Sequence, residues 1–98
     1  MTTELKTIDM FSDKVGSAFV LDEPGLPELE LTLTEVTPLR NYAQAAREPF
    51  SLIFTVPGAR VLPQRMYWLK HQTLGRQSVF LVPIAGSKEK VTYQAIFN

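Results

Sequence analysis

The stretch Leu29-Glu-Leu-Thr-Leu-Thr-Glu-Val36 indicates a β-sheet protein, because apolar and polar residues alternate along it. Successive side chains of a β-strand point to opposite faces, so this alternation predicts a strand with its leucines on the inner face. The run Phe50-Ser-Leu-Ile-Phe-Thr-Val56 has the same period, and so does Val91-Thr-Tyr-Gln-Ala-Ile-Phe97. Three half-buried strands in a short chain indicate a protein built on β-sheet.

The runs at residues 66–71 and 79–84 are rich in aromatic and β-branched residues and are two more strand candidates. A further candidate, at residues 17–22, precedes a turn. Turn residues separate them, notably Pro24-Gly25 and Leu74-Gly75. The sequence therefore predicts an all-β fold of six to seven mostly antiparallel strands, arranged as a small barrel or a two-layer sandwich. The 98 residues fit a single domain spanning 1–98.

Helix is scarce in this pattern. Residues 7–15 predict a short N-terminal helical turn with Thr7 as its N-cap, and Ile8, Phe11 and Val15 would share one side. Residues 41–47 have helical propensity over a short length, which predicts a turn within a surface connection.

The composition is that of an ordinary globular protein, with 45% hydrophobic and 20% charged residues. There are no cysteines, which excludes disulfides, thiolate chemistry and cysteine zinc sites. Residues 1–10 lack the basic start and apolar stretch of a signal peptide, and the apolar runs are too short for a membrane helix. We therefore expect a cytoplasmic protein without membrane contact.

The net charge is zero, but the charges are unevenly placed along the chain. Residues 1–36 hold eight of the ten acidic residues, and residues 37–98 hold eight of the ten basic ones. One explanation is that early and late strands pair, so that opposite charges meet across the sheet. The other is a pair of charged poles that guide docking or head-to-tail stacking. Nucleic acid is not an expected partner, because the late bases are scattered singly.

Reactive residues are few. A catalytic triad would need His71, the one histidine, together with Ser51 or Ser78 and Glu35, and neither serine lies in a nucleophile-elbow motif. We expect instead that His71 ends a strand and hydrogen-bonds the backbone of the following loop. Neither a metal-ligand cluster nor a phosphate loop is apparent, so the sequence predicts no cofactor and no enzymatic activity.

Several strands are apolar on both faces, which requires cover on both sides. Segments 5–15 and 38–48 could supply that cover. Otherwise the outward residues form an exposed surface for another protein or another copy of the chain. We call this surface the contact patch. Its residues are Ile53, Met66, Trp68, Phe80, Val82 and Ile84.

The second half of the chain carries a set of spaced motifs. They are Glu48-Pro-Phe-Ser-Leu52, Leu62-Pro-Gln64, Tyr67-x-Leu-x-His71, Leu74-Gly75, Phe80-Leu-Val-Pro83 and Tyr93-Gln-Ala-Ile-Phe-Asn98. With this spacing the chain resembles an uncharacterised bacterial family of small proteins, catalogued only as a domain of unknown function. Arg65 departs from the pattern, which has a glycine at that position. The resemblance implies a non-enzymatic accessory protein, found beside tail-collar-type proteins of phage-like origin, and it assigns no catalytic residues.

Two functional hypotheses follow. The first is a non-enzymatic structural or adaptor module that binds protein, either itself as a homo-oligomer or a different subunit, within a phage-tail-like or fibre assembly and thus a phage-like particle. The second is a small-ligand or carbohydrate-binding β-barrel that uses Tyr67, Trp68 and Tyr93 as stacking surfaces, which requires the three rings to line one cavity.

Overall fold

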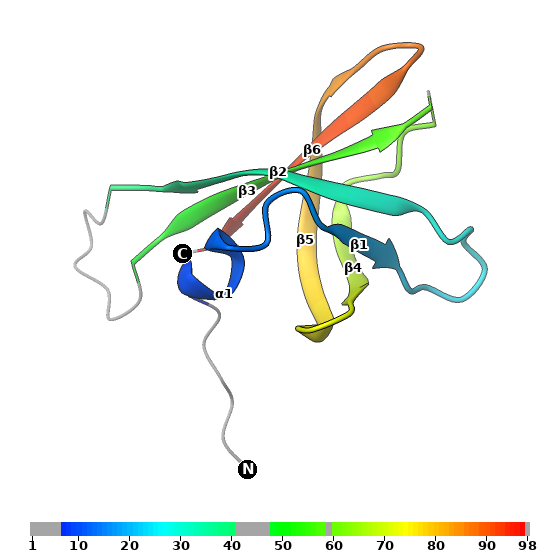
Figure 1. Cartoon of the computed structure of the whole chain (residues 1–98). Helices are drawn as coiled ribbons and strands as arrows, with labels where there is room; N and C mark the ends of the chain where they lie inside the picture. The colour runs from blue at the N-terminus through cyan, green and yellow to red at the C-terminus, as the bar shows by residue number, and fades with distance from the viewer. Residues whose placement is uncertain (1–6, 41–47, 59, 98) are drawn as a thin grey trace.

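The chain folds into a closed, six-stranded antiparallel barrel, as seen in a computed structural model that describes residues 7–40, 48–58 and 60–97. The elements are α1 (Asp9–Ser12), β1 (Ala18–Leu21), β2 (Glu30–Pro38), β3 (Phe50–Pro57), β4 (Arg65–His71), β5 (Gly75–Gly86) and β6 (Lys90–Phe97). Around the barrel the strands follow the order β1-β2-β3-β6-β5-β4, and β4 returns to pair with β1 (Figure 1). The all-β class is confirmed, and of the two predicted architectures the barrel is the one observed.

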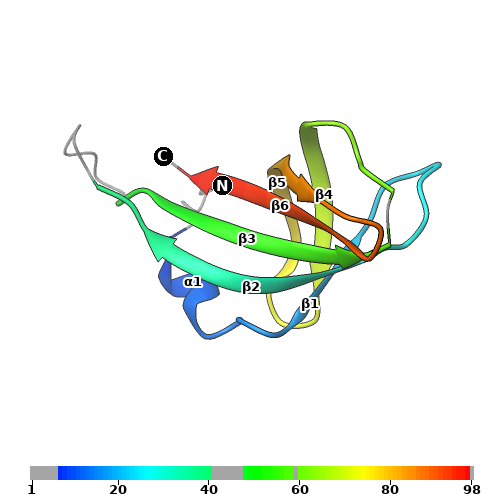
Figure 2. The same ribbon diagram turned by 90° about the horizontal axis from the view of Figure 1, so that it is seen from above.

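The alternating residues fill the barrel as the sequence predicts. On β3 and β6 alternate side chains are buried, including Phe54 and Tyr93, and on β2 Leu31 and Leu33 are buried up to a register shift between Leu33 and Glu35. The pairing of β3 with β6 is unbroken from Phe50 opposite Phe97 to Pro57 opposite Lys90. This long antiparallel ladder runs across the molecule, as the view from above shows (Figure 2). The predicted face of each strand is therefore the core face.

The helical turn closes one end of the barrel. Phe11 is fully buried, and its ring centroid lies 5.8 Å from that of Phe50 and 5.8 Å from that of Phe97. The expectation for Val15 is wrong, because Val15 is 51% exposed. The helix ends at Ser12, and the backbone leaves the helical path before it reaches Val15. Its N-cap is Ile8, which makes no side-chain cap, rather than Thr7.

Residues 60–64 close the other end of the barrel. Leu62 is buried, and its backbone N–H donates to the hydroxyl of Tyr93 at 2.9 Å. The hydroxyl of Tyr67 donates to the carbonyl oxygen of Pro63. Both tyrosine rings thus belong to the packed core, with their polar ends satisfied by one loop.

Strand β5 is longer than the predicted run 79–84, because it extends from Gly75 to Gly86. Gly75 has a φ of 73°, which lets β5 turn back on β4 directly after His71. Pro83 lies inside β5, next to a register shift between Pro83 and Ala85. A bulge is where a proline fits within a strand, because the ladder hydrogen bonds are already interrupted there. The predicted turn at residues 41–47 lies outside the described residues.

Candidate functional site

The contact patch lies on the outer wall of the barrel, over β4 and β5. Met66 stands directly opposite Phe80, and these side chains are 51% and 41% exposed. Trp68, two residues along β4 on the same face, is 39% exposed. Their neighbours Tyr67 and Leu69 are buried inside the barrel. The strand is thus apolar on both faces, and its outer face is covered neither by α1 nor by residues 38–40 and 48.

The register joins the remaining patch residues to this pair. Val82 follows Phe80 on the outer face of β5 and is half-buried. Gln94 of β6 pairs with Ile53 on β3 and with Val82 on β5, so it lies between these two patch residues. Ile84, at the bulge of β5, is 49% exposed. The six residues therefore form one band across the wall formed by β3, β6, β5 and β4.

Sequence reasoning missed one member of this wall. Ile96 is 50% exposed and lies two residues beyond Gln94 on β6. The alternation of β6 carries the signal for it, because Ala95 and Phe97 point inward and Ile96 must then point outward.

Trp68 is held in place by Arg76 of β5 and by two acidic residues, Asp22 and Glu23, that follow β1. The guanidinium carbon of Arg76 lies 4.2 Å from the centroid of the indole ring, and Arg76 Nε donates to Asp22 Oδ2 at 2.9 Å. Glu23 Oε2 accepts the backbone N–H of Trp68 at 2.7 Å, and its Oε1 accepts from Arg65 at 3.3 Å. Early acids thus meet late bases, which confirms the first explanation of the charge split for these two pairs. These contacts orient the indole ring on the outer wall.

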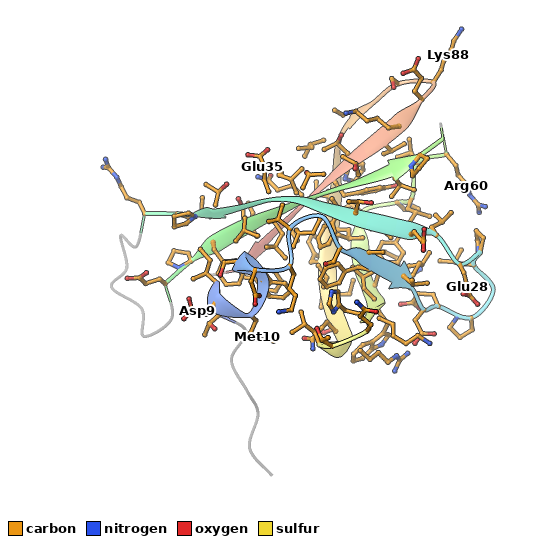
Figure 3. The ribbon with its side chains drawn as sticks, in the orientation of Figure 1. Asp9, Met10, Glu28, Glu35, Arg60 and Lys88 are labelled. Carbon is orange, nitrogen blue, oxygen red and sulfur yellow. The ribbon has the colours of Figure 1, made fainter. Side chains whose placement is uncertain are left out.

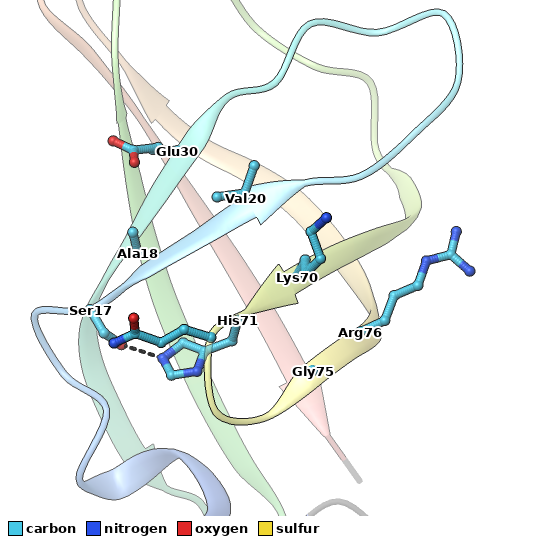
Figure 4. Close-up of a pocket in the computed structure, with 9 residues that line it drawn as sticks. Ser17, Ala18, Val20, Glu30, Lys70, His71, Gly75 and Arg76 are labelled. Carbon is cyan, nitrogen blue, oxygen red and sulfur yellow. Dashed lines mark hydrogen bonds between the residues drawn. The ribbon is translucent and has the colours of Figure 1, made fainter.

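A hollow of about 610 Å³ lies beside the patch on the barrel wall (Figure 4). The residues that line it are Ser17, Ala18, Val20, Glu30, Lys70, His71, Gln72, Gly75 and Arg76. A shallower hollow of about 500 Å³ adjoins it and brings together the exposed residues Glu28 and Glu30. Lys70 and Glu30 stand on either side of Val20 in the register, so the larger hollow has an acidic and a basic wall.

His71 forms the polar end of the larger hollow. Its Nδ1 accepts the backbone N–H groups of Thr73 at 3.1 Å and Leu74 at 3.3 Å. Nδ1 therefore carries the lone pair, and the proton is on Nε2, which donates to Ser17 Oγ at 2.9 Å. The Ser17 hydroxyl in turn donates to the carbonyl oxygen of Lys14. The predicted hydrogen bonds from His71 to the loop backbone are present.

These hydrogen bonds indicate a structural role for His71. Burial, followed by the nearby positive charge of Lys14, lowers the pKa of His71 and keeps the ring neutral. Because Nε2 already holds a proton, it cannot take the one on Ser17, as a nucleophilic serine would require. His71 is bonded to Ser17, Thr73 and Leu74, so the considered triad with Ser51 or Ser78 and Glu35 is not assembled.

The rings of the ligand-binding hypothesis do not line one cavity. Tyr67 and Tyr93 are each 1% exposed inside the barrel, whereas Trp68 lies on the outer wall. Within the described ranges, no group of three or more histidine, aspartate or glutamate side chains is placed to hold a metal ion. Among the same residues, no helix has the length and apolar character needed to cross a bilayer.

Comparison with known proteins gives a family without a known activity. No curated protein and no solved structure matches the chain. A family model described as a domain of unknown function matches residues 6–97, which is nearly the whole chain. The chain therefore belongs to the family called Domain of unknown function (DUF6916).

Proposed function

We propose that this chain is a non-enzymatic structural or adaptor module that binds another protein subunit through the contact patch. The observation that carries the proposal is the exposed cluster of Met66, Trp68 and Phe80 on adjacent strands. Exposed apolar side chains in contiguous groups are typical of protein interaction sites, and Trp, Met, Phe and Arg are enriched there.

The position of the contact patch on the barrel supports the proposed protein-binding function. It lies on paired strands and not on loops, so little conformational entropy is lost when a partner binds. Arg76 stacks on Trp68 and is itself held by Asp22, which orients an aromatic side chain and a cation together. The barrel is closed, so a partner would meet side chains on its wall and not an open strand edge.

The same proposal gives the chain a place in a bacterial cell. We propose that it acts in the cytoplasm as a subunit of a phage-tail-like or fibre assembly. The non-enzymatic part of the proposal is supported by His71, whose ring nitrogens are both engaged in structural hydrogen bonds.

The test is co-purification of the tagged chain from its own host, followed by quantitative mass spectrometry. The patch variant carries Met66→Thr, Trp68→Thr and Phe80→Thr, since threonine keeps the strand propensity and removes the apolar surface. The control carries Val15→Thr and Val61→Thr, two residues outside the patch that are 51% and 53% exposed. We expect one or more proteins to co-purify with the wild type and the control and to be lost with the patch variant. Equal recovery with all three chains would overturn the proposal.

A further inference from the structure

The exposed apolar pair of the contact patch and the larger hollow lie on opposite sides of Trp68. The outward residues of β4 follow in the order Met66, Trp68 and Lys70, about 6.7 Å apart because a strand rises about 3.3 Å per residue. Phe80 pairs with Met66 before the indole. Val20, which lines the hollow, pairs with Lys70 beyond it. One face of the barrel therefore carries both an exposed apolar pair and a hollow.

A two-fold axis through Trp68 exchanges these two features. The strands β5 and β1 flank β4 on its two sides. Phe80 is on the β5 side, level with the residue two before Trp68, and Val20 is on the β1 side, level with the residue two after it. A rotation by 180° about an axis perpendicular to the wall at Trp68 therefore brings Phe80 of each copy over Val20 of the other. Met66 comes over Lys70, whose methylene groups can pack against it.

The hollow has the room and the surface for a phenyl ring. Its volume is about 610 Å³, whereas an enclosed cavity of about 150 Å³ can hold benzene. Ala18 and the half-buried Val20 give it apolar lining (Figure 4). Glu30 and Lys70 on either side of Val20 are exposed, so their charged ends can stay in water while a ring enters.

The charges around Trp68 fit the same rotation. Asp22 donates its backbone N–H to the carbonyl oxygen of Trp68, so it lies level with Trp68 on the β1 side. The two-fold axis brings Asp22 of each copy over β5 of the other, next to Arg76. A guanidinium has five N–H donors, so Arg76 can donate to the partner's carboxylate and keep its bond to Asp22 of its own chain. Acids and arginines are equal in number here, which avoids a build-up of like charge between copies (Asp22, Glu23, Arg65 and Arg76).

From this arrangement we propose that the occupant of the contact patch is a second copy of the chain, bound face to face about a two-fold axis at Trp68. The Phe80 ring of each copy would fill the hollow of the other. A contact that uses the same surface on both copies is isologous, so it closes at a dimer. This inference rests on the proposed function, because it names the partner of the same patch.

The test is sedimentation velocity over a range of protein concentrations, with Phe80→Asp and Val20→Lys as single variants. The control, Lys88→Glu/Glu89→Lys, exchanges two charges at the tip of the β5–β6 hairpin, where Lys88 points away from the barrel (Figure 3). We expect the wild type and the control to form a dimer that grows no further. Each single variant changes two symmetry-related contacts, so its dissociation constant should rise about 100-fold, at about tenfold per contact. Far-UV circular dichroism and the urea midpoint verify that each variant is folded.

The decisive sample is an equimolar mixture of the two single variants. In a mixed dimer one Phe80 keeps its contact with Val20, and the introduced carboxylate faces the introduced ammonium group. We therefore expect a one-to-one dimer that is at least about tenfold tighter than either variant alone. A mixture no tighter than the single variants, or a wild type that grows beyond a dimer, refutes the two-fold arrangement.

The remaining outcomes separate this inference from the proposed function. If Val20→Lys associates as tightly as the wild type while Phe80→Asp does not, the hollow is not occupied, which refutes the inference and leaves the contact patch standing. A monomeric wild type refutes the second copy as partner, and the co-purification experiment then decides the proposed function separately.

Cross-linking covers the case in which Val20→Lys does not fold. The chain has no cysteine, so Met66→Cys and Lys70→Cys copies each carry a single thiol at an exposed position. Packed sheets lie about 10 Å apart, which is too far for a disulfide, so a short bismaleimide is used. We expect the mixture of the two copies to cross-link about tenfold faster than either alone, because Met66 lies over Lys70 in the dimer. Equal rates would overturn the inference.

Discussion

Replacing Phe80 with threonine tests whether the contact patch is needed for the stability of the fold. Phe80 is 41% exposed, so about three-fifths of its surface is covered in the folded chain. Full burial of a phenylalanine side chain stabilises by roughly 1.5–3 kcal/mol, and three-fifths of that is about 1–2 kcal/mol. Threonine keeps part of this contact and favours the strand conformation. We therefore expect Phe80→Thr to lower the free energy of unfolding by about 1 kcal/mol.

The matched control is its neighbour Leu81, which is fully buried on the inner face of the same strand. Leu81→Ala should cost about 2–5 kcal/mol, because it removes buried methyl groups and leaves a cavity. A domain of this size has a total stability of about 5–15 kcal/mol, so the two outcomes are well separated. Urea unfolding followed by far-UV circular dichroism measures both. If Phe80→Thr costs as much as Leu81→Ala, the outer ring is needed for the fold and the argument for a contact patch fails.

Three further predictions concern the residues around this wall. Burial lowers the pKa of His71 in the folded chain, so below about pH 6.5 the unfolded chain takes up a proton on this histidine before the folded chain does. The free energy of unfolding should therefore fall as the pH drops through about 6.5 towards the folded pKa. In urea titrations from about pH 8 to 5, His71→Gln should lose this part of the pH dependence. Glu23→Ala removes the acceptor of the Trp68 backbone N–H and should cost about 0.5–1.5 kcal/mol, because the bond is exposed and water can replace the carboxylate. Glu23→Gln keeps an acceptor oxygen and should cost less, and equal losses in urea unfolding would contradict this. Phe11→Ala should cost about 3–5 kcal/mol in the same assay, and a loss below about 1 kcal/mol would mean that α1 is not the closure of the barrel.

The strands and their faces could be predicted because they depend on neighbours in the sequence. Side chains two residues apart share a face, so Met66 and Trp68 are separated from Tyr67 and Leu69 by alternation alone. The contact patch follows from the same rule. Its exposure could not be predicted, because that depends on which segments pack against it, and α1 packs into the end of the barrel.

The hydrogen bonds that hold His71 and Trp68 in place could not be predicted, because they join residues far apart in the chain. Ser17 is the partner of His71, and Glu23 is the partner of the Trp68 backbone. Both contacts cross the seam between β1 and β4, and local periodicity contains no information about which strands close a barrel. The predicted run 79–84 is shorter than β5 for a local reason, because residues 75–78 are polar and alternate weakly.

The closure between β1 and β4 has a consequence for how the molecule would come apart. The register pairs only Val20 with Lys70 and Leu21 with Leu69 at this joint, while the β3–β6 ladder is eight residues long. Beyond the two pairs, backbone and carboxylate contacts from Asp22 and Glu23 to Trp68 take over. The β1–β2 joint has only three pairs, so β1 is weakly joined on both of its sides and we expect the barrel to open first at this strand. The amides of β1 should then exchange with solvent before those of β3 and β6. Asp22 and Glu23, which hold Trp68 in place, would then also help to keep the barrel closed.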